Sequence, residues 1–155
     1  MPTRFVCLAH SYKEGGRCLA GIALDNRNNP IIENGRPKWI RPVCETTHGE
    51  VPQYLVSHIN ILDIIEIEVT KYHEQGYQSE NATFQENSLQ TIGKFSINSL
   101  NGLCETKPMI FGNKGKAVSE KAIVNLTHSL MLVKVTIFDV IEKTYEDAPH
   151  KTKIR

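Results

Sequence analysis

The alternation of apolar and polar residues along this chain predicts short β-strands more often than helices. An apolar run from Val6 leads into a polar turn and resumes at Cys18, which is the pattern of a hairpin. Residues 38–43 and 61–69 alternate in strand fashion. Residues 129–138 form an apolar run of strand length, which we place in the centre of the sheet. The pattern therefore favours a chain dominated by five or six strands.

Helical spacing is limited to two short stretches. Residues 96–103 carry a serine at the N-cap position ahead of apolar residues three apart, and residues 119–125 form a second brief helix candidate. Short strands with long connections fit a small OB-like β-barrel, with a PUA-like barrel as the alternative. We predict a mainly β protein with its barrel domain in residues 1–140. Residues 141–155 form a polar, basic tail that could begin a second barrel.

Composition and charge are those of an ordinary globular protein. The 155 residues are 40% hydrophobic and 23% charged, which argues against disorder. The net charge of +1 excludes a globally basic protein of the arginine-rich kind, so any affinity for nucleic acid must come from a local patch. No apolar run has the length of a membrane span and no signal-peptide core follows Met1. We predict a cytoplasmic protein with no membrane partner.

The loop between the first two apolar runs carries two cations and two glycines. Lys13 and Arg17 flank Gly15 and Gly16, whose missing Cβ atoms let backbone N–H groups approach a ligand. The neighbouring Tyr12 is a candidate stacking platform. Such a loop suits an anionic group. The alternative is a solvated hairpin turn, because Gly-Gly is a common turn signal.

A Trp-x-Arg strand supplies the next candidates. Trp39 and Arg41 fall on one face of the 38–43 strand. The guanidinium of Arg41 can hold a phosphate or stack on a base, and the indole of Trp39 can serve as a stacking platform. Arg41 could instead pair with Glu66 or Glu68, and Trp39 could be a core residue.

An amide-rich stretch in the middle of the chain fits a recognition loop or a plain surface loop. Gln78 and Asn81 could read base edges through hydrogen bonds, as could the carboxylate of Glu80. Glu80 could instead bind Arg17 or Arg41, which would neutralise the binding surface.

The four cysteines lie far apart, with no Cys-x-x-Cys pair. Cys7 with His10 and Cys44 with His48 could form a zinc site, but the spacing is unlike that of usual zinc sites, and reduced thiols are the simpler interpretation. Cys7 or Cys18 with a histidine could be a nucleophile and its base, yet both lie in apolar runs and no known catalytic signature is present. We predict no metal, no cofactor and no catalytic residue, and a Cys/His enzyme is the least favoured alternative.

Three stretches together resemble the bacterial dual OB-containing domain family. They are residues 6–21, residues 39–43 and residues 76–81, with the strands at residues 62–65 and 129–130 in the expected order. The resemblance implies two small OB-like barrels in succession, with the second one incomplete in this sequence. It also implies a context of bacterial defence or mobile elements, and a role in binding nucleic acid or nucleotides.

These observations lead to the hypothesis of a non-catalytic binding module for nucleic acid or nucleotide-like anions. One alternative is a pocket that sequesters a small nucleotide, which needs a closed cavity. Another is a structural module that docks to a protein partner through its C-terminal strand. The predicted ligand-binding residues are Ser11, Lys13, Arg17, Trp39, Arg41, Gln78, Glu80 and Asn81.

Overall fold

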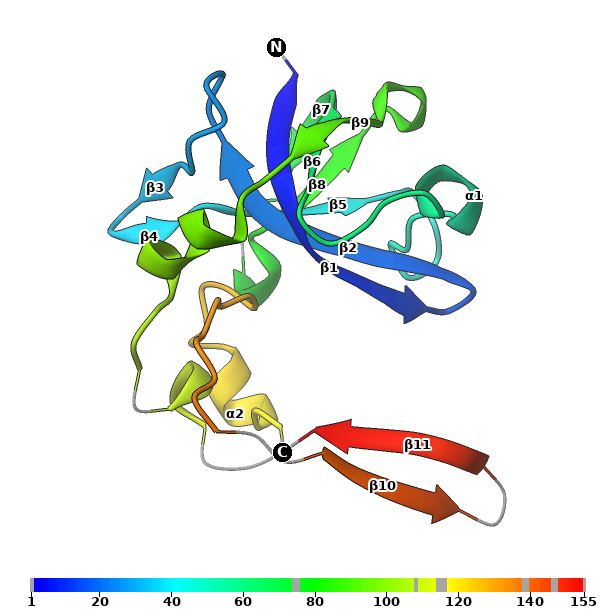
Figure 1. Cartoon of the computed structure of the whole chain (residues 1–155), viewed down its shortest axis with the longest axis vertical. Coiled ribbons are helices and arrows are strands. Elements are labelled where there is room, and N and C mark those ends of the chain that lie inside the picture. The colour runs from blue at the N-terminus through cyan, green and yellow to red at the C-terminus, as the bar shows by residue number, and fades with distance from the viewer. Residues whose placement is uncertain are drawn as a thin grey trace.

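A seven-stranded sheet is the main element of the fold (Figure 1). It is seen in a computed structural model, which describes residues 2–73, 76–107, 109–113, 117–137, 140–145 and 148–154. The strands of this sheet are β1 (Thr3–Lys13), β2 (Gly16–Leu24), β5 (Trp39–Val43), β6 (Asp63–Ile67), β7 (Val69–Tyr72), β8 (Asn81–Phe84) and β9 (Gln90–Lys94). They lie in the order β7-β8-β5-β2-β1-β6-β9.

The two longest strands, β1 and β2, form the predicted hairpin. Its turn consists of Glu14 and Gly15, whose φ angles of 43° and 85° are both positive, as the tight turns that suit twisted hairpins require. Lys13 and Gly16 face each other across the turn. The loop that we considered as an anion site is therefore a two-residue hairpin turn.

The strand order closes into a barrel because β6 and β7 are consecutive in the chain. β7 lies at one end of the order, paired with β8, and β6 lies next to the other end, paired with β1 and with the last strand, β9. Only Glu68 separates β6 from β7 in the chain. The N–H of Glu68 donates to the Ser88 hydroxyl at 2.8 Å, and its carbonyl accepts from the N–H of Gln85 at 2.9 Å. β5 and β8 pair in parallel, whereas the other pairs are antiparallel. A short helix, α1 (Gln53–Val56), lies between β5 and β6 in the chain. The predicted mainly β, OB-like fold is confirmed.

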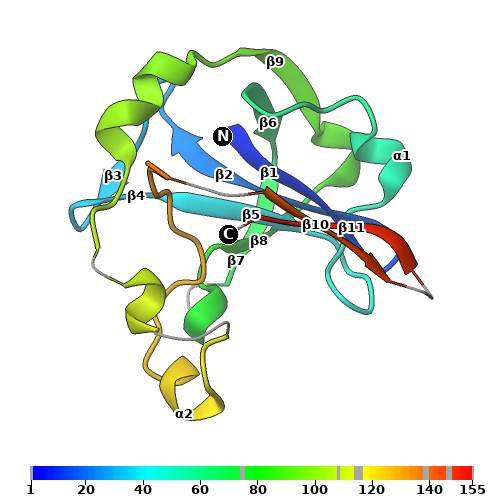
Figure 2. The same ribbon diagram turned by 60° about the horizontal axis from the view of Figure 1, so that its bottom comes forward.

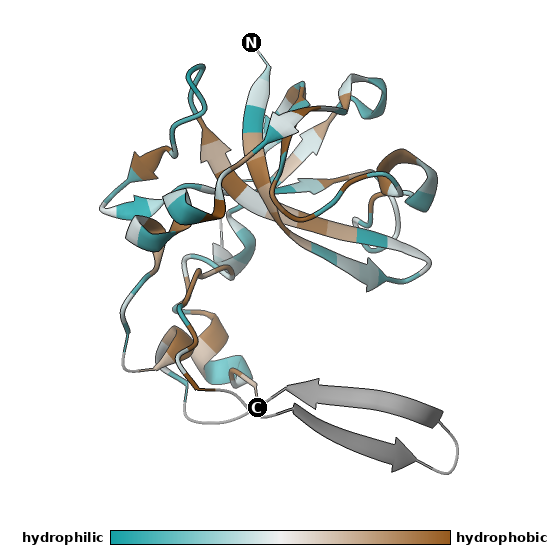
Figure 3. Ribbon diagram, in the orientation of Figure 1, coloured by the Kyte–Doolittle hydropathy of each residue, from teal (hydrophilic) through white to brown (hydrophobic). Residues whose placement is uncertain are grey.

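Apolar side chains pack on both faces of the sheet. Inside the barrel, β1, β2, β5, β6 and β8 contribute buried residues, and β7 adds the partly buried Val69. Brown apolar segments along β1 and β2 in Figure 3 follow this pattern. A second cluster lies on the outer face, where Val6, Ile22 and Leu24 are covered by Phe95 and by side chains from residues 100–132. The outer face is thus only partly covered by protein.

The remaining elements are short. They are β3 (Ile32–Glu33), β4 (Arg36–Pro37), η1 (Gly76–Gln78), η2 (Glu86–Ser88), η3 (Ile97–Leu103), η4 (Ile110–Gly112), α2 (Glu120–Ile123), β10 (Val140–Tyr145) and β11 (Ala148–Ile154). β3 pairs with β4, β10 pairs with β11, and η3 lies beside the β3–β4 hairpin in both Figure 1 and Figure 2. No helix in the described part of the chain is long and apolar enough to cross a membrane.

Both predicted helices are present, and the predicted central strand is not. Ser96 and Ser119 occupy the N-cap positions of η3 and α2. Residues 129–137 form no strand, so their placement at the centre of the sheet is wrong; Phe138 lies outside the described residues. Polar side chains bind the backbone of this segment at residues 129 and 130, and Leu132 packs on the outer cluster. An apolar run cannot reveal such partners, because they are distant in sequence.

Candidate functional site

A groove of about 410 Å³ lies on the outer face of the barrel beside the β1–β2 turn. Arg41 and Val43 of β5 line it, while the alternating Ile40 and Pro42 are buried. Five of the eight predicted ligand-binding residues meet here although they come from separate parts of the sequence. The described lining consists of Ser11, Tyr12, Lys13, Cys18, Arg41, Val43, His48, Gly49, His73, Gln78 and Asn81.

The floor of the groove is organised around Arg41. Its Nη1 donates to Oδ1 of Asn81 at 3.3 Å, and its Nη2 donates to the Ser129 hydroxyl at 2.9 Å. The Nε atom is buried and has no hydrogen-bond partner among the described residues. Nδ2 of Asn81 in turn donates to Oε1 of Gln78 at 3.4 Å. This polar chain fixes the guanidinium between β5 and β8 rather than pairing it with a carboxylate.

Basic side chains line the groove. The amine of Lys13 donates to the backbone carbonyl of His48. His73 lines the opposite side, where its Nε2 lies 2.9 Å from the Thr83 hydroxyl. None of the described residues that line the groove is an aspartate or a glutamate. Its charge is therefore positive in a protein that is nearly neutral overall.

Three predicted residues lie outside the groove. The guanidinium of Arg17 stacks on the ring of Tyr12, 3.5 Å from the centroid, and its Nε donates to Oε1 of Gln53 at 2.6 Å. Trp39 is half-buried against the outer cluster and, like Glu80, lines a neighbouring hollow. Arg17 thus supports Tyr12, a groove residue, without lining the groove itself.

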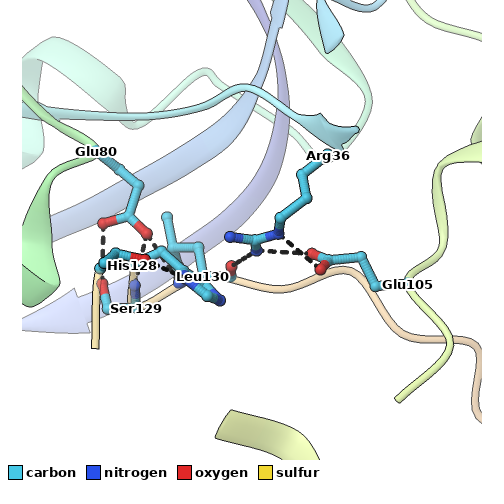
Figure 4. A network of polar contacts seen from close by, with 7 residues as sticks. Arg36, Glu80, Glu105, His128, Ser129 and Leu130 are labelled. Atoms are coloured by element: carbon cyan, nitrogen blue, oxygen red, sulfur yellow. Dashed lines mark hydrogen bonds and ion pairs between the residues drawn. The ribbon is translucent and has the colours of Figure 1, made fainter. Parts of the chain in front are cut away.

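Glu80 is buried, and both of its proposed arginine pairings are wrong in this structure. Its Oε1 accepts hydrogen bonds from the N–H groups of Ser129 at 2.6 Å and Leu130 at 3.0 Å (Figure 4). Its Oε2 accepts from the Ser129 hydroxyl at 3.2 Å. The carboxylate therefore holds the 129–130 backbone against β8, and Ser129 links it to Arg41.

The opposite side of the same segment is held by an ion pair. Arg36 binds Glu105 through two hydrogen bonds of 2.8 and 2.9 Å, and it also donates to the carbonyl of Leu130 at 3.4 Å (Figure 4). These bonds from Arg36 hold the pKa of the Glu105 carboxyl below its usual value. Arg41 does not pair with Glu66, since Arg4 binds that carboxylate at 2.7 Å.

Two histidines that line the groove were not among the predicted ligand-binding residues. Neither His48 nor His73 belongs to a recognisable sequence motif. His48 lies in the loop after β5 and His73 directly follows β7, so the closed barrel determines where both side chains lie. His48 was considered for zinc or catalysis. No group of three or more metal-binding side chains occurs within the described ranges.

The thiols divide into buried and accessible ones. Burial, together with the nearby charge of Asp63, raises the pKa of Cys7 to about 11. Burial likewise raises the pKa of Cys44 to about 12, with Glu86 adding to the effect. Both remain protonated at neutral pH, which argues against either as a nucleophile. Cys18, by contrast, is partly exposed in the groove.

Alkylation should therefore separate the cysteines of the native protein. We expect iodoacetamide to modify Cys18 at least about tenfold faster than Cys7 or Cys44, because the thiolate is the reacting form and needs access. Peptide mass spectrometry of a time course measures this. Cys104 is the control, since it is partly exposed but lies away from the groove. Equal rates for Cys18 and Cys7 would contradict the described burial.

The strand order and the position of the groove define a class of protein, the OB-type barrels. In that class a five-stranded barrel binds its ligand on the face of the second and third strands and between two flanking loops. The chain belongs to the dual OB-containing domain family, whose model matches residues 3–155. Comparisons with curated proteins and with solved structures gave no match.

Proposed function

We propose that the groove binds single-stranded nucleic acid by holding its backbone phosphates on Lys13 and Arg41. One observation carries this proposal: cations from distant strands converge in a groove that has no acidic lining among its described residues. A guanidinium offers two parallel N–H donors to a phosphate, and a lysine amine offers a mobile point charge. The buried, unpartnered Nε of Arg41 adds a donor that a small rearrangement would expose.

The location of the groove supports the same proposal. β1, β2 and β5 correspond to the first three strands of an OB barrel, and β6 with β7 and then β8 supply the last two. The β1–β2 turn and the loop between β7 and β8 then flank the groove, as the ligand-binding loops of OB barrels do. Lys13 is the last residue of β1, directly before the first of these loops, and Gln78 lies in the second.

The shape of the groove favours a strand over a sequestered small nucleotide. Ser11, Tyr12, His48 and Gln78 are all exposed, so the groove opens to solvent along its rim. An enclosed cavity would be needed to remove most of a mononucleotide from water. A strand instead gains affinity from several phosphates and bases along an open surface.

Replacing Lys13 and Arg41 together with alanine should weaken binding about a hundredfold and flatten its salt dependence. Each lost phosphate contact removes roughly one unit from the slope of log K against log salt. Fluorescence anisotropy of labelled single-stranded DNA and RNA at two salt concentrations measures both quantities. Unlabelled mononucleotides are added as competitors, and they should compete poorly.

The matched control replaces an arginine and a lysine outside the groove. Lys71 and Arg27 are exposed and do not line the groove, so their double alanine variant should bind within about threefold of the wild type. Equal losses in the two double variants would show diffuse electrostatic attraction and overturn the assigned site. Efficient competition by mononucleotides would favour the small-nucleotide alternative.

A further inference from the structure

A second hollow, of about 590 Å³, adjoins the groove and is lined by aromatic side chains. Trp39 of β5, Tyr72 of β7 and His128 all contribute to it. We call it the aromatic hollow. The ring of Tyr72 is 43% exposed, and the amine of Lys38 lies 5.7 Å from its centroid. Trp39 lines the hollow while packing against the outer cluster on its other side.

Charged side chains around the aromatic hollow are already paired with one another. Lys38 binds Glu33 at 2.7 Å, and Arg36 binds Glu105 at 2.8 Å. The carboxylate of Glu80 is occupied by backbone N–H groups. The hollow therefore differs from the groove, where no described lining residue is acidic and neither Lys13 nor Arg41 forms an ion pair with a described residue. Paired charges beside aromatic rings suit a planar, uncharged polar group better than a phosphate.

The aromatic hollow and the groove share two neighbouring strands. Trp39 and Arg41 point to the same face of β5 two residues apart, which is about 7 Å along a strand. On β8 and the loop before it, Glu80 lines the hollow and Asn81 lines the groove. This spacing is on the scale of one nucleotide, so one strand can occupy both sites.

We propose that the aromatic hollow stacks a base of the nucleic-acid strand whose phosphates lie in the groove. This inference rests on the proposed function and adds to it a base-dependent component of affinity. Trp39 and Tyr72 provide the apolar ring surfaces. The side chains of Ser79 and His128, which also line the hollow, provide polar groups for the edge of the base.

Fluorescence of Trp39 tests the inference directly, because it is the only tryptophan in the chain. The probes are a thymidine decamer and a decamer of the same length with abasic sugars, each also carrying a terminal label for anisotropy. We expect the thymidine decamer to bind about tenfold more tightly than the abasic one. It should also quench Trp39, whereas the abasic decamer should leave the emission unchanged.

A tyrosine variant separates stacking from folding. Tyr72→Leu should remove most of the roughly tenfold preference for the thymidine decamer while leaving binding of the abasic decamer unchanged. Tyr54→Leu is the matched control, since Tyr54 is an exposed tyrosine on α1 that lines neither site, and it should keep the full preference. Circular dichroism confirms that both variants fold.

Two outcomes would overturn the inference in distinguishable ways. If both decamers bind equally and Trp39 emission does not change, phosphates alone are recognised, so the aromatic hollow is not a base site although the groove proposal stands. If neither decamer binds, the proposed function fails and the inference fails with it.

Discussion

Replacing Gly21 with alanine should lower the free energy of unfolding by about 3 kcal/mol or more. Gly21 lies on β2, and a Cβ atom there would stand 1.8 Å from the backbone oxygen of Val6 and 2.8 Å from Cδ2 of Phe5. The backbone of β1 cannot yield, because it is paired with β2 on one side and β6 on the other. Urea unfolding followed by circular dichroism measures the loss.

Gly93→Ala is the matched control for that substitution. Gly93 is also a strand glycine, on β9, and its added Cβ would meet only Cδ1 of Ile64, at an ordinary 3.8 Å. Alanine at this position should change the free energy of unfolding by no more than about 1 kcal/mol. It lowers the conformational entropy of the unfolded chain and introduces no clash in the folded one. A loss at Gly21 as small as the one at Gly93 would mean that the barrel accommodates the added Cβ, which would contradict the prediction.

Gly21 illustrates which parts of the fold were predictable from the sequence. The alternation of residues 38–43 and the runs around the first turn predicted strands, because a pleated strand exposes every second side chain. The same pattern presented Gly21 as one small member of an apolar run. The main chain of β1 passes through the position that a Cβ of residue 21 would occupy. This close approach depends on the local register of β1 and β2, including the shift between Cys7 and Ala9.

The candidate site was predictable in part, where polar or charged side chains stand in predicted loops or on one face of a predicted strand. Lys13 is a cation of the predicted loop and Arg41 a cation of the predicted 38–43 strand, and both line the groove. Arg17 is also a cation of the predicted loop, but it pairs with Tyr12 across the hairpin and its guanidinium binds Gln53. His73 enters the groove only because β7 and β8 close the barrel, so no local signal could have identified it.

The run at residues 129–138 shows the limit of hydrophobic pattern most clearly. Its composition favours a buried strand, and a strand would need a neighbouring ladder to pair its N–H groups. Glu80 supplies those partners instead, from a position about fifty residues earlier. The carboxylate thus satisfies the first two N–H groups of the run in an irregular conformation, with charge-assisted hydrogen bonds.

Replacing Glu80 with alanine should therefore destabilise the protein by about 3 kcal/mol and release the segment around Ser129. The change removes three hydrogen bonds to a buried carboxylate, so the N–H groups of Ser129 and Leu130 lose their acceptor. Hydrogen exchange should show a loss of protection at these two amides. Among the amides of the barrel strands, the ranking from most to least protected should stay the same. Glu68→Ala, at an exposed glutamate, is the control and should cost less than about 1 kcal/mol.

A conservative variant tests whether the geometry or the charge of Glu80 holds the segment. Both N–H groups donate to the same oxygen, Oε1, so the amide oxygen of a glutamine can still accept them. Glu80→Gln should consequently lose only about 1 kcal/mol and retain protection of both amides. If glutamine is as damaging as alanine, the negative charge itself is required. If both variants retain full protection, the hydrogen bond from Arg36 to the carbonyl of Leu130 and the packing of Leu132 hold the segment without Glu80. In that case Ser129 would keep its contact with Arg41, and the floor of the groove would not depend on Glu80.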